Sequence, residues 1–155
     1  RHRPAPFAVP ERLKVEAALA HAHGTKFGII CSSGVMPLLN DYLGSGIDVL
    51  VGIDPEQGTR TDMGRIREIL GGRVCLWGGV SGALTVERGT EKDIRKAVQT
   101  AISTLGREGV VLSPVDNITI DTPKTWENIA IFLDAWRENR QRCGWWRYNA
   151  SYVKR

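Results

Sequence analysis

Four short apolar segments in this chain are each followed by glycine or polar residues and then by sequence of helix-forming composition. These segments are residues 26–31, 47–51, 74–77 and 110–112. The alternation predicts parallel strands joined by helices, because a parallel strand needs a long crossover before its neighbour can pair with it. We therefore expect an α/β protein with a helix-covered parallel sheet. The pattern alone leaves open whether that sheet is open or bent into a barrel.

The helices between these segments have recognisable ends. Gly44 is expected to stop the second helix, and Thr61 is expected to cap the third. Thr90 and Asp93 have the spacing of a capping box at the start of the fourth. Thr122 suits the N-cap of the last helix. The residues expected on the buried face of that helix are Trp126, Ile129, Ala130, Leu133 and Trp136.

Composition places the chain among ordinary globular proteins. It has 155 residues, of which 42% are hydrophobic and 25% charged, and no apolar run reaches membrane-spanning length. Its three cysteines are widely spaced, which argues against a disulfide scaffold. Since no secretory signal is recognisable, cytoplasm is the expected location and no membrane partner is expected. The net charge of +4 comes from a basic tail, because the rest of the chain is near neutral.

Polar or aromatic side chains stand at the expected carboxyl end of every strand. Because parallel strands deliver their carboxyl ends to one edge, we expect these residues to meet at a single cavity mouth. Asp116 is one of these residues, and the family resemblance described below makes it the candidate catalytic residue. The candidate substrate-binding residues are Ser32, Ser33, Asp54, Gln57, Trp77 and Asn117.

Each candidate also has an ordinary structural explanation. Asp54 precedes a proline, and Asp-Pro commonly opens a turn. Asp116 and Asn117 can satisfy the amides of a turn, as Asp and Asn often do. Trp77 precedes two glycines, which is typical of a floor that a flat ligand can approach closely, but core packing would explain the tryptophan equally well.

Other ligand classes find little support in the sequence. No complete phosphate-binding fingerprint is present. His21 and His23 are two residues apart on a helix and so point to different faces, which does not suit a metal site. Residues 140–155 mix basic and aromatic side chains, but without a recognised motif they are expected to pack on the protein rather than to bind nucleic acid.

Several short motifs, in this order and spacing, resemble the C-terminal half of one family. They are Ser33-Gly-Val-Met-Pro-Leu-Leu39, Gly46-Ile-Asp-Val-Leu50, Arg73-Val-Cys-Leu-Trp-Gly-Gly79, Gly89-Thr-Glu91, and Val111-Leu-Ser-Pro114 followed by Asp121-Thr-Pro123. The family is the uroporphyrinogen decarboxylase superfamily, which also contains zinc-dependent methyltransferases acting on methylated corrinoids. The resemblance covers residues 26–139, with a leading helix and linker at 1–25 and a basic aromatic tail at 140–155.

The resemblance implies a TIM-type (β/α)8 barrel, of which this chain holds about four of the eight units. A half barrel would expose two strand edges and an apolar interior. We therefore expect the chain to be part of a longer protein that supplies the N-terminal half, or to close as a homodimer, or to rearrange into an open sandwich. The half alone is expected to be inactive.

The family's site residues carry over only in part. Its corrinoid-linked methyltransferases hold zinc with a His-x-Cys pair and a further Cys, and the matching positions here are Ile30, Ser32 and Asp116. A zinc site of that design is not expected. Uroporphyrinogen decarboxylases have a histidine at the position of Asp116. The resemblance therefore implies that Asp116 is a proton donor or hydrogen-bonding group, provided that burial raises its pKa toward neutrality.

Three functions follow as expectations. The first is a decarboxylase-like lyase that acts on a carboxylated tetrapyrrole or a related small anionic compound without metal or cofactor. The second is a corrinoid (cobalamin)-dependent methyltransferase, which would need another zinc site. The third is a non-catalytic binding module derived from the family.

Overall fold

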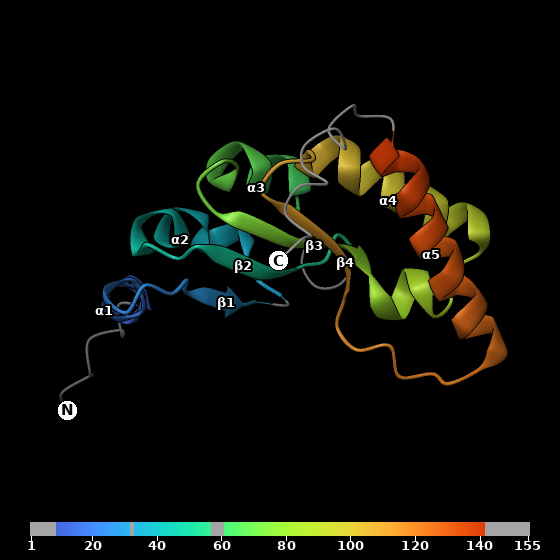
Figure 1. Cartoon of the computed structure of the whole chain (residues 1–155), viewed down its shortest axis with the longest axis horizontal. Coiled ribbons are helices and arrows are strands. Elements are labelled where there is room, and N and C mark those ends of the chain that lie inside the picture. Colours follow the sequence, from blue (N-terminus) through green and yellow to red (C-terminus); the bar gives the residue numbers. More distant parts are fainter. Residues whose placement is uncertain (1–8, 32, 57–60, 142–155) are drawn as a thin grey trace, which may run out of the picture.

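The structure is a computed structural model and describes residues 9–31, 33–56 and 61–141 (Figure 1). The elements in chain order are α1 (Val9–Ala22), β1 (Gly28–Ile30), the 3-10 turn η1 (Met36–Leu38), α2 (Leu39–Ser45), β2 (Val49–Ile53), α3 (Met63–Leu70), β3 (Cys75–Ser81), the π-helical turn η2 (Gly82–Val86), α4 (Glu91–Leu105), β4 (Val110–Val115) and α5 (Pro123–Gln141). None of the helices in the described ranges has the length and apolarity needed to span a membrane.

The four strands form one parallel sheet in the order β1-β2-β3-β4. Each helix packs against the next along the chain, from α1 to α5, so the helices make a single continuous layer. An open doubly wound sheet would carry helices on both faces, whereas a barrel carries them on its outside only. The expected α/β fold of parallel βα units is therefore confirmed as part of a TIM-type barrel. The sheet is not closed, and β1 and β4 are its two edges.

The predicted helix ends are right for α4 and wrong for two others. Thr90 and Asp93 form the expected capping box, with each side chain bonded to the other residue's backbone N–H. The cap of α3 is Asp62 rather than Thr61, because the Asp62 carboxylate accepts the N–H of Arg65. Helix α2 continues past Gly44 and ends at Gly46, which is the residue with a left-handed backbone.

Strands β3 and β4 are longer than the sequence predicted. Trp77 was expected at a strand end, but β3 continues through the glycine pair to Ser81, residue by residue beside β4. Likewise, Ser113 and Pro114 were expected in a turn and lie inside β4. Proline is tolerated there because β4 is an edge strand of this sheet.

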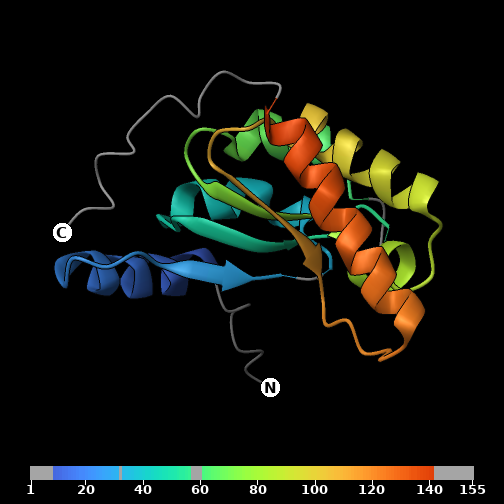
Figure 2. The same cartoon turned by 45° about the vertical axis from the view of Figure 1, so that its right-hand side comes forward.

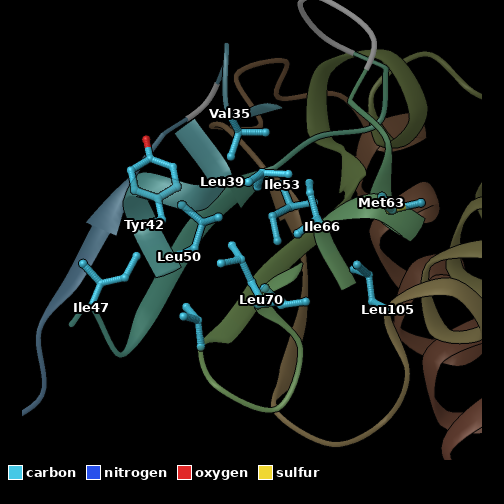
Figure 3. Packing of buried hydrophobic residues seen from close by; sticks show 12 residues of the cluster. Val35, Leu39, Tyr42, Ile47, Leu50, Ile53, Met63, Ile66, Leu70 and Leu105 are labelled. Carbon is cyan, nitrogen blue, oxygen red and sulfur yellow. The ribbon is translucent and has the colours of Figure 1, made fainter. Parts of the chain in front are cut away.

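The core lies between the sheet and the helical layer. Leu50, Ile66 and Leu76 are fully buried in its larger cluster, which fills the space between the sheet, α2 and α3 (Figure 3). A second cluster joins β3 and η2 to α4 and α5, the two long helices that run side by side in Figure 2. Alternate strand residues therefore point into these clusters, as expected for strands covered on one face.

The buried face of α5 agrees with the prediction only in part: Ile129 and Trp136 pack against the second cluster as expected. Trp126 and Leu133, expected inside, are 62% and 41% exposed. The buried residues of the helix are Thr125, Asn128, Phe132 and Ala135. The reason is Asn128. Its amide nitrogen donates to the carbonyl of Val86, the last residue of η2, at 2.8 Å and to that of Gly89, just after η2, at 3.1 Å. Those hydrogen bonds turn the asparagine inward and the tryptophan outward.

Candidate functional site

The face of the sheet opposite the helices carries a row of apolar side chains. Ile30, Val51, Trp77 and Val111 are neighbours in register across all four strands. Ile30 is 78% exposed and Trp77 41%, whereas Leu50 and Leu76, one position earlier on β2 and β3, are fully buried. This row corresponds to the inner face of a barrel and is open in this chain.

A pocket of about 480 Å³ lies over this row, toward the carboxyl ends of the strands. Its lining residues are Ile30, Val51, Gly52, Trp77, Ser113, Pro114, Val115, Asp116 and Asn117. The floor is therefore apolar and aromatic, and the polar groups at its rim come from the end of β4. No lysine, arginine or histidine is among these lining residues.

Trp77 is held in one orientation at the floor of the pocket. Its indole N–H donates to the hydroxyl of Ser113 on the neighbouring strand, with an Nε1 to Oγ distance of 2.9 Å. The indole thus has a polar partner within the sheet, and its apolar ring remains partly exposed. Such an arrangement can stack on a flat ring compound.

Asp116 and Asn117 form the rim of the pocket directly after β4. Both side chains are exposed. Asp116 has a positive φ of 63°, the single described non-glycine residue with this property. A left-handed backbone at Asp costs about 1 kcal/mol, so the surrounding structure must hold it. The exposed carboxylate can accept hydrogen bonds from a ligand, and the amide of Asn117 can both donate and accept.

Asp54 follows β2 as expected, but it does not line this pocket. It is 1% exposed, and its Oδ1 accepts the N–H of Glu56 at 2.8 Å, which is the bond of an Asp-initiated turn. The neighbouring Glu56 in turn accepts the hydroxyl of buried Thr85, with an oxygen-to-oxygen distance of 2.7 Å. These contacts connect the loop after β2 to η2.

The remaining predicted residues follow β1 and β2. Ser33 is exposed outside the pocket, and its carbonyl lies 3.1 Å from the thiol of Cys31. Ser32 and Gln57 lie outside the described residues. Burial and the neighbouring Cys31 raise the pKa of Tyr42 well above its usual value, so this phenol stays protonated. The structure therefore brings together Trp77, Asp116 and Asn117, and it separates Asp54 and Ser33 from them.

Sequence reasoning missed the apolar lining of the pocket. Ile30 and Val51 point to the open face because they alternate with core residues, and only strand register reveals that they adjoin Trp77. Ile30 and Asp116, two of the three positions at which the sequence resemblance placed metal ligands, line the same pocket. An isoleucine cannot bind a metal. Within the described residues, no group of three or more His, Cys, Asp or Glu side chains is placed to hold one.

Comparison with known proteins found a matching family and solved structures of similar fold. The family model described as "Uroporphyrinogen decarboxylase (URO-D)" matches residues 6–139. Among solved structures, a methyltransferase from Methanosarcina mazei is similar, with a TM-score of 0.65 and 23% sequence identity. The similarity covers 85% of this chain and 36% of that one, so the chain spans little more than a third of the neighbour's length. No curated protein matches the chain.

At 23% identity the structural likeness concerns the fold alone, and it supports the half-barrel arrangement of the strands. The family match extends from before α1 to the last turns of α5. Together with the motifs that follow each strand, this establishes that the chain belongs to the uroporphyrinogen decarboxylase family.

Proposed function

We propose that the chain supplies half of the ligand-binding site of a decarboxylase-like lyase whose substrate is a flat, carboxylated ring compound of the tetrapyrrole class. The observation that carries this proposal is the row of Ile30, Val51 and Trp77 beneath a pocket whose rim presents Asp116 and Asn117. A broad apolar floor suits a macrocycle, and polar groups at one edge suit its ring nitrogens.

The acidic side chains of such a substrate would point away from this half. The pocket lining has no cationic side chain, and a carboxylate gains nothing from the nearby Asp116. Groups that neutralise these carboxylates would come from the strands that complete the barrel. Those strands would belong to a longer protein or to a second copy of the chain.

Decarboxylation breaks the bond between a carbon and its carboxylate, and CO2 leaves. The electron pair passes into the protonated ring system, and a proton is then returned to the carbon. In this scheme the apolar row holds the ring, and Asp116 accepts hydrogen bonds from the ring N–H groups. Asp116 is exposed in this half, so it can return the proton only when the strands that complete the barrel bury it and it has itself been protonated. No metal takes part in these steps.

Methyl transfer is the second candidate, because the similar solved structure is a methyltransferase. The donor set favours it less, since an isoleucine occupies one of the metal-ligand positions and the aspartate at another would need new partners. Stoichiometric zinc in the purified complete protein, with loss of methyl transfer on chelation, would support this candidate over decarboxylation.

Binding is tested with uroporphyrin, the stable oxidised form of the carboxylated tetrapyrrole. Titration of the chain, followed by porphyrin absorbance, should give saturable binding. Trp77→Leu should weaken it roughly two- to tenfold, the value of one aromatic contact. Leu19→Ala is the control, because Leu19 is an apolar residue on α1 that is 62% exposed and does not line the pocket. Equal losses in the two variants, or no binding by the wild type, would contradict the proposal.

Catalysis is tested in the complete protein with uroporphyrinogen as substrate. Asp116→Asn is the informative variant, because asparagine also tolerates the left-handed backbone and only the acid is removed. We expect turnover to fall by roughly 10²- to 10⁴-fold. Asp121→Asn, in the same loop, should retain activity because Asp121 bonds the indole of Trp126 instead of lining the pocket. Full activity of Asp116→Asn would remove Asp116 from the mechanism.

A further inference from the structure

The loop between β4 and α5 carries the polar rim of the pocket, and another part of the chain holds it from two sides. Figure 1 shows this loop, residues 116–122, passing beside the short turn η2 on its way to α5. Neither η2 nor the residue that follows it lines the pocket. Both nonetheless contact this loop or the strand residue that precedes it.

The first contact comes from Glu87, directly after η2. Its carboxylate oxygen Oε1 accepts the backbone N–H groups of Thr119 and Ile120 and the hydroxyl of Thr119. Glu87 is 8% exposed although no cation pairs with its side chain in the described structure. A buried carboxylate with three donors on one oxygen fixes those donors strongly, because charge-assisted hydrogen bonds are the stronger kind. These hydrogen bonds also hold the pKa of Glu87 below its usual range.

The second contact comes from Gly82, at the start of η2. A Cβ atom at this position would lie 2.5 Å from the carbonyl oxygen of Val115 and 3.3 Å from that of Asp116. Real Cβ atoms essentially never approach a carbonyl oxygen at the shorter of these distances. The backbone of the turn therefore lies directly against the residue pair that leads into the rim, and only glycine permits this approach.

The turn itself is anchored from α5. Fully buried Asn128 donates to the carbonyls of Val86 and Gly89, one on each side of Glu87, and the Glu87 N–H donates to Gly82. These hydrogen bonds hold the segment 82–89 against α5. Gly82 contacts the chain at Val115 and Asp116, and Glu87 contacts it further along, at Thr119 and Ile120. Asp116 keeps its left-handed backbone next to these contacts, as expected for a strained residue that the surrounding structure holds in place.

We propose that Glu87 is a positioning residue of the pocket, which acts with Gly82 to fix the loop so that Asp116 and Asn117 present their polar groups to the ligand. The part of this inference that concerns ligand binding rests on the proposed function. The part that concerns the loop stands on the contacts above.

The loop is tested first, without ligand, by amide NMR of the chain. In Glu87→Ala the amide signals of Thr119 and Ile120 should lose their hydrogen-bonded shifts, and those of Asp116 and Asn117 should move. Glu87→Gln keeps an acceptor oxygen and should restore most of the wild-type positions. Glu68→Ala is the control, because Glu68 is an exposed glutamate paired with Arg65 on α3. Unmoved Asp116 and Asn117 signals in Glu87→Ala would overturn the inference.

The ligand is tested second, with uroporphyrin and a double-mutant cycle. Glu87→Ala should weaken binding roughly three- to tenfold in the wild-type background and have little effect when Asp116 and Asn117 are both alanine. Equal losses in both backgrounds would mean that Glu87 supports only the fold, which would overturn the positioning role. If the wild type does not bind uroporphyrin, the proposed function fails while the NMR test of the loop still decides the inference. If Glu87→Ala does not fold, Gly82→Ala, which disturbs the other contact of the loop, provides the same two measurements.

Discussion

Asp48 connects α1, β1 and β2, and replacing it gives a quantitative test of the fold. Its Oδ2 accepts the backbone N–H of Phe27 at 2.9 Å and lies 2.7 Å from Nε2 of His21, while Lys26 Nζ lies 2.8 Å from Oδ1. The carboxylate stands just before β2 and joins it to α1 and to the residues that precede β1. Its side chain is 18% exposed.

The magnitude follows from the exposure of Lys26 and from the charge-assisted hydrogen bond of the Phe27 N–H. The Lys26 side chain is 79% exposed, so this ion pair contributes about 0–1 kcal/mol. The partly buried N–H of Phe27 bonds to a charged acceptor, which contributes about 1.5–3 kcal/mol, and an amide oxygen would keep about half of that. We therefore expect Asp48→Asn to lower the free energy of unfolding by about 1–2 kcal/mol near neutral pH.

The pH dependence gives the sharper signature. The bonds from Lys26, the Phe27 N–H and His21 hold the pKa of Asp48 well below its usual range. A carboxylate whose pKa is lowered by folding stabilises the protein fully above its unfolded pKa, about 3.9, and loses this contribution as the pH falls toward the folded value. The difference between wild type and Asp48→Asn should therefore be full at pH 7 and shrink below about pH 4.

The assay is urea unfolding followed by circular dichroism at several pH values. Asp134→Asn serves as control, because Asp134 pairs with Arg137 on the exposed surface of α5 and its loss should cost less than about 1 kcal/mol. Asp48→Asn would refute the reasoning if it unfolded like the wild type at pH 7. A difference that stayed constant down to pH 2 would refute the electrostatic part.

Three further predictions are checked by the same unfolding measurement. Gly78→Ala should lower the free energy of unfolding by about 3 kcal/mol, because φ is +138° and a Cβ would lie 2.7 Å from the Ile53 carbonyl oxygen. Gly72→Ala, in open space, should lower it by about 1 kcal/mol. Equal losses would contradict the close packing of β2 and β3. Leu76→Ala should cost about 2–5 kcal/mol since Leu76 is fully buried, and a loss below about 1 kcal/mol would contradict the assigned core face of β3. Thr90→Ala should cost about 1 kcal/mol through loss of the capping box, and a neutral result would argue against that cap.

The sequence predicted the fold best where local and tertiary signals agree. Thr90 and Asp93 cap α4, and its apolar positions repeat at helical spacing, so both signals indicate the same helix. Prediction failed where tertiary pairing overrides local preference. Glycine and proline usually interrupt a strand, yet Gly79 and Pro114 continue theirs because each has a neighbouring strand to pair with. On α5, hydrophobicity favoured a buried Trp126, but the structure buries Asn128 to bond two carbonyls.

The site was predictable only in part for the same reason. The rule that polar residues gather at the carboxyl ends of parallel strands places Asp116 and Asn117 at the pocket. It does not reveal that Asp54 turns inward to its own loop. The apolar floor depends on strand register, and the contact of Glu87 with the loop depends on hydrogen bonds between residues far apart in the sequence. Neither feature has a sequence pattern of its own.

The central claim is that a flat ring compound lies on the open face of the sheet beside Trp77. A porphyrin ring shifts nearby proton signals strongly, so two-dimensional NMR of the isotope-labelled chain, titrated with uroporphyrin, maps its position directly. The account predicts the largest shifts at Val51, Trp77, Ser113, Asp116 and Asn117, with Val98 on the helical side unchanged. Shifts confined to α5 or to the helical layer, or no shifts at all, would contradict it.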